Sequence, residues 1–454
     1  MESKIINGSN SQSEKEYKKY AKVGIMIMIV LVSSFGFLLV SPYIPNEIGR
    51  ILDEKYYYEA LERIQQIRKG NFSIQIQYSN GTIVTGKEIS YRLVNHDFLF
   101  GAMFFHFNEF SDNQTNMKYA EMFSDVFNYA MLPFYYASWA SPDNFTIESR
   151  INASIEYLHS KNIKIKGHTL VWNHPAGVPE WFGDLKRMER QEIERKFKSR
   201  IQNVLIKYRE NISIWDVTNE FVHRNKFGSL NTLEFAHKCF EWAREVHPSG
   251  TFVFNDYGMM GHDFGYGDTY QFLQKLNQMG TPYDAIGMQS HAMDTDWIPT
   301  YEIYHTLEGF SKLNKKIHIT EFFATSLPVV ITNSWKTGLW SEEAQAEYTK
   351  RFYTMCFSHP SVEAISWWGF EDGKNNQKDP GYGLLHNNLR PKKTYLVLKD
   401  LINNQWNSTG SILKSSENPV TINCFFGKYE FVIENKSYFV DLSKSSSRNT
   451  ILLL

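Results

Sequence analysis

The sequence predicts an α/β protein built on a (β/α)8 TIM barrel. Between residues 97 and 405, short apolar runs alternate eight times with longer amphipathic stretches. Buried parallel strands are typically near-continuous apolar runs, and each parallel neighbour needs a long crossover, usually a helix. Eight such units close into a barrel of about 250 residues or more. The chain has 454 residues, so further segments are expected at both ends of the barrel.

The barrel strands are expected where the apolar runs are rich in β-branched and aromatic residues. These runs cover residues 98–104, 127–132, 163–170, 214–218, 252–254, 285–288, 317–320 and 364–367. Helices are expected between them, for example over residues 190–208 and 233–246.

Segments with a different residue pattern flank the barrel. Residues 46–70 are amphipathic and predict a helix, and the stretch up to residue 96 alternates apolar and polar residues. Asn80-Gly81 lies between two alternating runs, which predicts a β-hairpin. We therefore expect a helix plus β-hairpin extension over residues 46–96. Residues 406–454 again alternate, which predicts a C-terminal β tail packed against the barrel.

The N-terminus predicts a membrane anchor. Residues 23–40 contain no charge, and Lys15, Lys18, Lys19 and Lys22 precede them. The run is at the lower end of what spans a bilayer, and the preceding lysines favour a cytoplasmic N-terminus. We expect a cytoplasmic polar tail over residues 1–22 and a single transmembrane helix over residues 23–44, with the rest of the chain outside. Cleavage of this segment as a signal peptide, and hence secretion, is the alternative.

Composition excludes several classes of protein. A formal net charge of −1 argues against binding to nucleic acid. The three cysteines, Cys239, Cys356 and Cys424, are too few and too irregularly spaced for a disulfide framework or a zinc site. His168 and His174 are six residues apart on a strand and its loop, a spacing that does not bring them together on a metal.

Two glutamates give the strongest functional signal. Glu220 ends the apolar run that begins at Ile214, and Glu321 ends the run that begins at Ile317. A carboxylate at the mouth of a buried strand is costly unless it has a partner or a chemical role. Two carboxylates on separate strands of one sheet are the equipment of a retaining glycosidase.

Other polar and aromatic residues recur at the ends of the expected strands, which is where barrel enzymes carry their functional groups. The candidate substrate-binding residues are His168, Trp172, Asn173, Asn219, Gln289, His291 and Trp368. The fifth strand ends in Asn255-Asp256-Tyr257, where we expect Asp256 to support the site without direct contact with substrate.

Taken together, these segments resemble glycoside hydrolase family 10, the xylanase family of retaining barrel enzymes. The matching segments are GHTLVW (167–172), WDVTNE (215–220), FND (254–256), GMQSH (287–291), ITE (319–321) and WWG (367–369). They extend over most of residues 97–405 in the family's order, which makes the combination specific.

The resemblance implies a role for each matching residue. Glu220 matches the acid/base and Glu321 the nucleophile, with carboxyl groups about 5–5.5 Å apart, a raised pKa for the acid and a lowered pKa for the nucleophile. Asn219 matches the residue that binds the sugar 2-hydroxyl. His291 matches the histidine that orients the nucleophile, and Gln289 lies near it.

The remaining matches surround the sugar at the cleavage point. His168 and Trp172 match residues beside that sugar, and Trp368 matches an aromatic lid over it. No cofactor or metal is implied by the resemblance.

The sequence departs from the family at several positions. Residues 133–137, Pro-Phe-Tyr-Tyr-Ala, stand where the family has a Glu-Asn-x-x-Lys cluster that holds the sugar next to the cleavage point. Asn173 replaces a histidine, and Phe323 replaces an aspartate. A second stacking tryptophan is missing after residue 369, where Tyr382 could substitute. Loss of these polar groups should change which sugar is bound.

The sequence thus predicts a retaining β-glycoside hydrolase, endo-acting on xylan or a related β-1,4-linked polysaccharide. Two alternatives stay open, a cell-surface transglycosylase with the same machinery and a carbohydrate-binding protein with weak or no catalysis. The sequence does not determine the oligomeric state.

Overall fold

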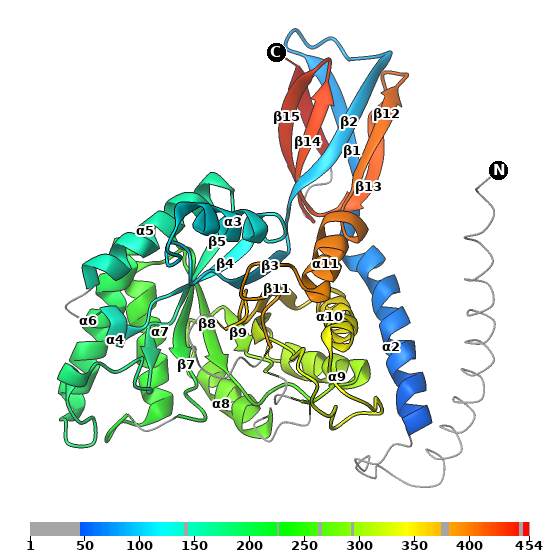
Figure 1. The fold of residues 1–454 in the computed structure, drawn as a ribbon. Coiled ribbons are helices and arrows are strands. Elements are labelled where there is room, and N and C mark those ends of the chain that lie inside the picture. Colours follow the sequence, from blue (N-terminus) through cyan, green and yellow to red (C-terminus); the bar gives the residue numbers. More distant parts are fainter. Residues whose placement is uncertain are drawn as a thin grey trace.

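The computed structural model of the chain describes residues 46–139, 144–224, 227–261, 266–291, 295–373, 381–444 and 448–453. They form a barrel with a smaller β-domain attached at one end (Figure 1). The predicted cytoplasmic tail and transmembrane helix lie outside the described residues. Among the helices that are described, none combines the length and apolar character needed to cross a membrane.

The predicted eight-stranded parallel barrel is confirmed. Its strands are β3 (Leu99–Met103), β4 (Tyr129–Pro133), β5 (Lys164–His168), β7 (Ile214–Asn219), β8 (Thr251–Asp256), β9 (Ala285–Met288), β10 (Lys316–Phe322) and β11 (Val362–Trp367). Neighbouring strands pair in parallel, and pairing of Lys166 with Ile214 joins β5 to β7 and closes the ring. The short strand β6 (Val171–Trp172) adds to β7 at its C-terminal end.

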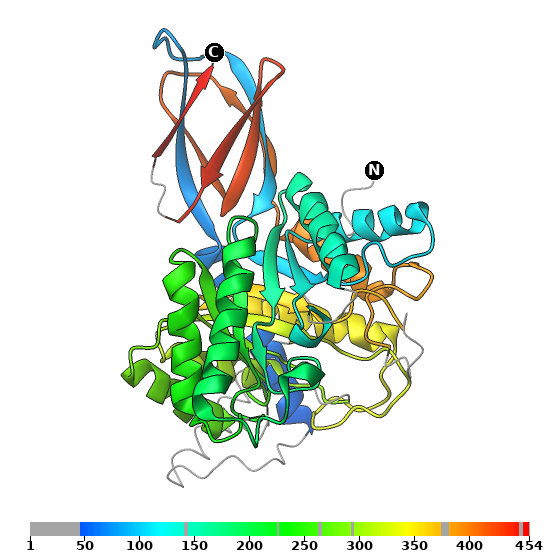
Figure 2. The same ribbon diagram turned by 90° about the vertical axis from the view of Figure 1, so that its left-hand side faces the viewer.

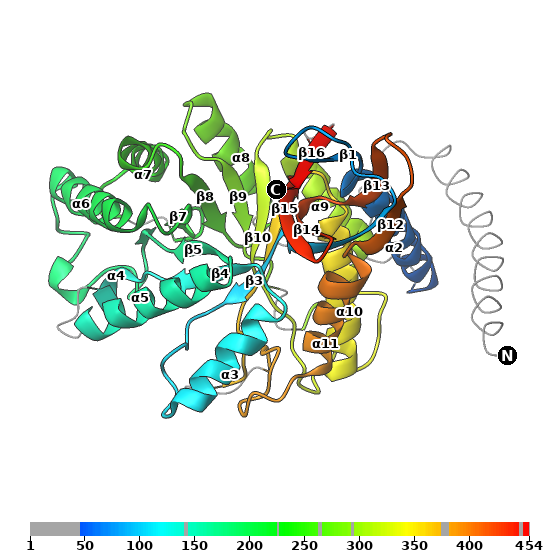
Figure 3. The ribbon, with the colours of Figure 1, turned by 90° about the horizontal axis from the view of Figure 1, so that it is seen from above.

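Helices surround the barrel, as the view from above shows (Figure 3). They are α3 (Asn113–Ser124), α4 (Tyr136–Trp139), α5 (Asn144–Ser160), α6 (Arg190–Tyr208), α7 (Thr232–Val246), α8 (Tyr266–Gln278), α9 (Thr300–Ser311), α10 (Glu342–Phe357) and α11 (Lys393–Asp400). A 3-10 turn (Glu180–Phe182) and a π-helical turn (Leu401–Gln405) complete the ring. Helices α6 and α7 cover the stretches that the sequence predicts.

The helix before the barrel, α2 (Asn46–Ile67), belongs to this outer ring, because it packs against α9 and α10. Asp53 of α2 is fully buried and accepts a hydrogen bond from the backbone N–H of Thr300 at the start of α9. Arg351 of α10 pairs with Asp53 at 3.1 Å. Since a buried carboxylate needs such partners, this contact fixes α2 on the barrel.

The flanking β segments form one domain of two sheets, which lies above the barrel in Figure 2. Strands β1 (Lys69–Tyr78), β13 (Val420–Phe425) and β16 (Arg448–Leu453) form one sheet in the order β13-β1-β16. The other has the order β12-β2-β14-β15, from β12 (Thr409–Lys414), β2 (Lys87–His96), β14 (Gly427–Ile433) and β15 (Lys436–Leu442). The domain is therefore a β-sandwich built from both ends of the described chain.

The predicted hairpin at Asn80-Gly81 forms only close to its turn, where Gln77 and Ile83 make an isolated antiparallel bridge, while the long strands β1 and β2 do not pair with each other. A tight turn does form at Asn80-Gly81, where the N–H of Tyr78 donates to the carbonyl of Thr82 at 2.8 Å. Gly86, with φ +69°, then redirects the chain, and β2 joins the opposite sheet. Burial explains the choice, because Ile74 of β1 and Ile89 of β2 are almost completely buried in the apolar core, which also takes in strands of the C-terminal segment.

A substitution in β1 tests whether the two ends of the described chain share one hydrophobic core. Ile74 is completely buried and pairs with Val420, about 350 residues further along the chain. We expect Ile74→Ala to lower the free energy of unfolding by about 2–5 kcal/mol, measured by urea denaturation. Leu413→Ala, at a side chain that is 63% exposed on β12, should change it by less than about 0.5 kcal/mol. Equal effects of the two substitutions would contradict the sandwich.

Candidate active site

The two glutamates lie at the C-terminal end of the barrel, away from the sandwich. Glu220 directly follows β7, and Glu321 is the next-to-last residue of β10. Glu220 has φ +58°, a left-handed backbone conformation that is uncommon for a residue other than glycine. Such conformations persist where the surrounding structure enforces them, often at functional sites.

Glu321 is buried and held by donors on both oxygens. Its side chain is 4% exposed, and His291 Nε2 lies 2.9 Å from one carboxylate oxygen. The Asn255 amide donates to the other oxygen at 2.7 Å. Burial alone would raise the pKa of Glu321, but the hydrogen bond from His291 and the nearby charge of His168 outweigh it and lower the pKa. Glu321 is therefore ionised at neutral pH.

Glu220 has a different environment. The indole N–H of Trp172 donates to Glu220 Oε2 at 2.8 Å, and the Gln289 amide donates to Oε1 at 3.3 Å. Arg224 Nε, one helical turn further along the chain, is 2.7 Å from Oε2. The Glu220 side chain is 12% exposed, so it keeps contact with solvent while Glu321 is nearly sealed.

Side-chain amides connect the two carboxylates. The Asn255 side-chain amide donates both to Glu321 and to the side-chain oxygen Oδ1 of Asn219, the latter at 2.8 Å. Gln289 lies between that same oxygen and Glu220, at 3.3 Å from each. The chain of contacts from Glu220 through three amides to Glu321 puts both carboxylates in one site.

A buried charge pair supports the site from inside the barrel. His168 Nδ1 is 2.8 Å from Asp216 Oδ2 and 3.9 Å from Glu321 Oε1. Lys166 Nζ is 2.7 Å from the other oxygen of Asp216, and both side chains are fully buried. Burial alone would raise the pKa of Asp216, but Lys166 and His168 lower it below its usual value. The ionised Asp216 in turn fixes the ring of His168 beside Glu321.

Aromatic rings enclose this constellation. The rings of Trp368 and His168 are 5.5 Å apart, and those of Trp368 and His291 are 6.1 Å apart, each pair nearly perpendicular. Trp172 stacks on His174 at 4.0 Å. Trp368 and Trp172 are both only partly buried, which leaves them part of the surface near the carboxylates. Asn173 follows Trp172 and is also half-buried, and its contact with substrate stays a prediction.

The positions that depart from the family have become apolar or aromatic contacts. Phe323 stacks on Tyr382 at 3.8 Å and faces the His291 ring at 4.7 Å. Phe134 is completely buried, whereas Tyr135 packs against the rings of His168 and Trp172. Tyr135 thus brings one phenol to the site. Burial and the nearby charges of the two glutamates raise its pKa, so the phenol stays protonated.

The structure adds residues that the sequence analysis did not assign to the site. Asn255 bridges the carboxylates, Arg224 pairs with Glu220, and Asp216 orients His168. Asp256 accepts hydrogen bonds from His223 and from the N–H of Val222 in the loop after Glu220, and its indirect role stays a prediction.

Comparison with known proteins identifies the family. The family described as Glycosyl hydrolase family 10 matches residues 94–401. The chain belongs to this family. It is a glycosidase, and its sequence is similar to those of endo-1,4-β-xylanases.

Proteins of similar sequence include xylanases and a protein named as an anti-sigma factor. Endo-1,4-beta-xylanase B of Thermotoga neapolitana is 28% identical over 260 residues, which cover 55% of this chain and 72% of that protein. Anti-sigma-I factor RsgI6 of Acetivibrio thermocellus is 25% identical over 332 residues, which cover 73% of this chain and 40% of that protein. Native xylanase 10B of Thermotoga maritima shares the fold, with a TM-score of 0.56 at 24% identity, covering 68% of this chain and 96% of that one.

The contact between His291 and Glu321 predicts a pH effect. His291→Ala removes the hydrogen bond that lowers the pKa of Glu321, so that pKa should rise. If Glu321 must be ionised to react, the acidic limb of the kcat/KM profile should move to higher pH by about one unit. His174→Ala, at a ring that stacks on Trp172, is the control and should leave that limb in place. An unmoved acidic limb in the His291 variant would show that this contact does not set the ionisation.

Proposed function

We propose that the protein is a retaining β-glycoside hydrolase, endo-acting on xylan or a related β-1,4-linked polysaccharide. Glu321 is the nucleophile and Glu220 the acid/base. The observation that carries this proposal is the difference between two connected carboxylates. Glu321 is buried and kept ionised by His291, whereas Glu220 is partly open to solvent and to an incoming group.

Each carboxylate suits one part of a double displacement. A Glu321 oxygen bonds to the anomeric carbon while the bond from that carbon to the departing oxygen breaks, and Glu220 transfers its proton to that oxygen. Glu220 then takes a proton from a water molecule, whose oxygen attacks the same carbon and releases Glu321. The Asn255 amide contacts both Asn219 and Glu321. Asn219 therefore lies close to Glu321 and can bind the sugar 2-hydroxyl.

The family and the aromatic surface of the site support this choice of substrate. Trp172 and Trp368 offer ring faces, and Tyr135 adds a phenol within the segment that replaces the polar cluster of the family. Rings pack well against the C–H face of a pyranose. These contacts favour a flat, equatorially linked chain such as a β-1,4-xylan. A transglycosylase would use the same residues, with a sugar hydroxyl in place of water.

A carbohydrate-binding role with weak or no catalysis is the second candidate. The loss of the Glu-Asn-x-x-Lys cluster at residues 133–137 favours it. So does the similarity to a protein whose name is that of an anti-sigma factor, over 73% of this chain. Retention of both glutamates, with donors on each oxygen of Glu321, favours catalysis.

We further propose that residues 23–44 anchor the chain in a membrane and place the barrel outside the cytoplasm. The proposal rests on the uncharged run of residues 23–40 and the lysines before it. Secretion after cleavage of this segment is the alternative outcome.

Covalent trapping tests the catalytic proposal directly. An activated 2-deoxy-2-fluoro-xylobioside should react with the protein in a 1:1 ratio, and peptide mass spectrometry should find the label on Glu321. The fluorine slows hydrolysis of the glycosyl–enzyme ester, because it destabilises the positively charged transition state, so the label stays on the protein. Glu321→Gln should abolish labelling completely.

Glu371→Gln is the matched control, because Glu371 is a nearly buried carboxylate after β11 that pairs with His106. It should still be labelled at Glu321. A label on another residue would overturn the nucleophile assignment. Absence of labelling, together with retained binding of xylobiose, would favour the carbohydrate-binding candidate.

A further inference from the structure

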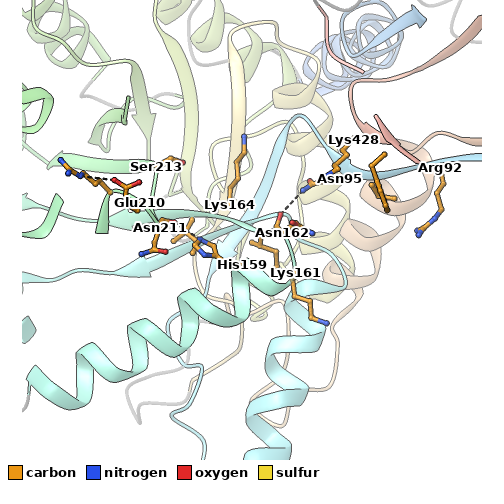
Figure 4. Close-up of a pocket in the computed structure, with 15 residues that line it drawn as sticks. Arg92, Asn95, His159, Lys161, Asn162, Lys164, Glu210, Asn211, Ser213 and Lys428 are labelled. Carbon is orange, nitrogen blue, oxygen red and sulfur yellow. Dashed lines mark hydrogen bonds and ion pairs between the residues drawn. The ribbon is translucent and has the colours of Figure 1, made fainter. Parts of the chain in front are cut away.

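A groove of about 840 Å³ lies where the sandwich meets the barrel. The sandwich contributes residues of β2, β14 and β15, and the barrel contributes the start of β5 and the segments that lead into β5 and β7 (Figure 4). Ser213 lines the groove just before β7, and Glu220 follows the same strand at its other end. Seven residues of extended chain separate them by about 23 Å, so the groove is distinct from the active site.

The groove is strongly basic although the chain as a whole carries a net charge of −1. Glu210 is the one acidic residue that lines it, whereas its basic residues are Arg92, Lys161, Lys164, Arg209 and Lys428. Glu430 pairs with Arg92 at 2.6 Å, and Glu210 pairs with Arg209 at 3.4 Å. The groove therefore gathers positive charge that its own carboxylates only partly neutralise.

Three lysines of the groove have no acidic partner. Lys161, Lys164 and Lys428 are exposed, and no carboxylate of the described residues lies within 4.0 Å of their amino groups. In Figure 4 the basic side chains are spread along the groove and do not converge on one point. This spacing suits a ligand with several separated negative charges better than a single phosphate group.

The other lining groups suit a sugar chain. Phe439 is 59% exposed, an unusual state for a large aromatic side chain, and Lys428 Nζ lies 5.6 Å from the centre of its ring. Asn162, Asn211 and Ser213 add amide and hydroxyl groups along the floor. An open aromatic face beside amides and cations can stack on a pyranose ring while it binds hydroxyls and carboxylates.

We propose that this groove is a second carbohydrate-binding site, which holds an acidic polysaccharide through the carboxylates of its uronic acid residues. The sandwich strands that form one wall lie almost entirely outside residues 94–401, the part of the chain that matches the glycosidase family. The groove would hold the enzyme on an acidic glycan while the opposite end of the barrel acts on its substrate.

Binding to polygalacturonate tests the proposal without involving catalysis, because its α-linkages are not substrates for a retaining β-glycosidase. The full chain, produced in bacteria so that the Asn211-Ile212-Ser213 sequon carries no glycan, is titrated by calorimetry in low salt. We expect binding that weakens as salt is added. Carboxyl-reduced polygalacturonate and unsubstituted xylan should not bind at this site. The Glu321→Gln variant should bind polygalacturonate as tightly as the wild type. Binding in the groove is therefore tested independently of the catalytic proposal.

Reversing the charge of the groove lysines then tests whether polygalacturonate binds in the groove. The triple variant Lys161→Glu, Lys164→Glu and Lys428→Glu should weaken binding of polygalacturonate at least tenfold, since each exposed charge contributes a modest attraction. The control variant Lys118→Glu, Lys275→Glu and Lys312→Glu carries the same change of charge at exposed lysines of α3, α8 and the end of α9, and should weaken it less than twofold.

Three results would overturn the proposal. Equal weakening by the two triple variants would show non-specific attraction. Absence of binding by the wild type would rule out the ligand class. Binding to phosphatidylserine vesicles that the groove lysines control, without binding to polygalacturonate, would identify the groove as a membrane-facing surface instead.

Discussion

The site depends on keeping Glu321 charged inside a nearly sealed barrel. Removing a carboxylate from water costs several kcal/mol, and this cost disfavours the ionised form, which is the form that the proposed nucleophile needs. Here the cost is offset by directed donors from β8 and the end of β9, the Asn255 amide and the His291 ring, and by the charge of His168. Those donors can converge only because the C-terminal ends of parallel strands meet at one end of the barrel.

The same constraint explains the charged interior beneath the site. His168 can support Glu321 only if its ring is fixed, and Asp216 fixes it from below while Lys166 neutralises Asp216. An apolar layer contributed by six strands closes the N-terminal end of the barrel, including Leu99 and Ile214. Charge is therefore confined between this layer and the site, where it is paired. The groove at the sandwich lies beyond the apolar layer and is separated from this network.

Sequence patterns predicted the barrel because its strands are buried on both faces and are continuous apolar runs. They also predicted Glu220, Glu321 and His291, which end such runs or follow them directly. The hairpin pattern predicted only the pairing next to its turn, because a turn signal is local, whereas most of β1 pairs with strands about 350 residues further along the chain. Asn255 was given no role at the end of its strand, and Arg224 was not singled out, for a related reason. Nothing in their own segments shows which neighbouring carboxylate they contact, and only closure of the barrel determines it.

We propose that Glu321 and Glu220 act in succession on one anomeric carbon. The stereochemistry of the product tests this proposal, because two displacements preserve the configuration and one inverts it. Hydrolysis of an aryl β-xylobioside can be followed by proton NMR from the first minutes, before mutarotation mixes the anomers. We expect the β-anomer of the released sugar to form first. Initial release of the α-anomer would contradict it.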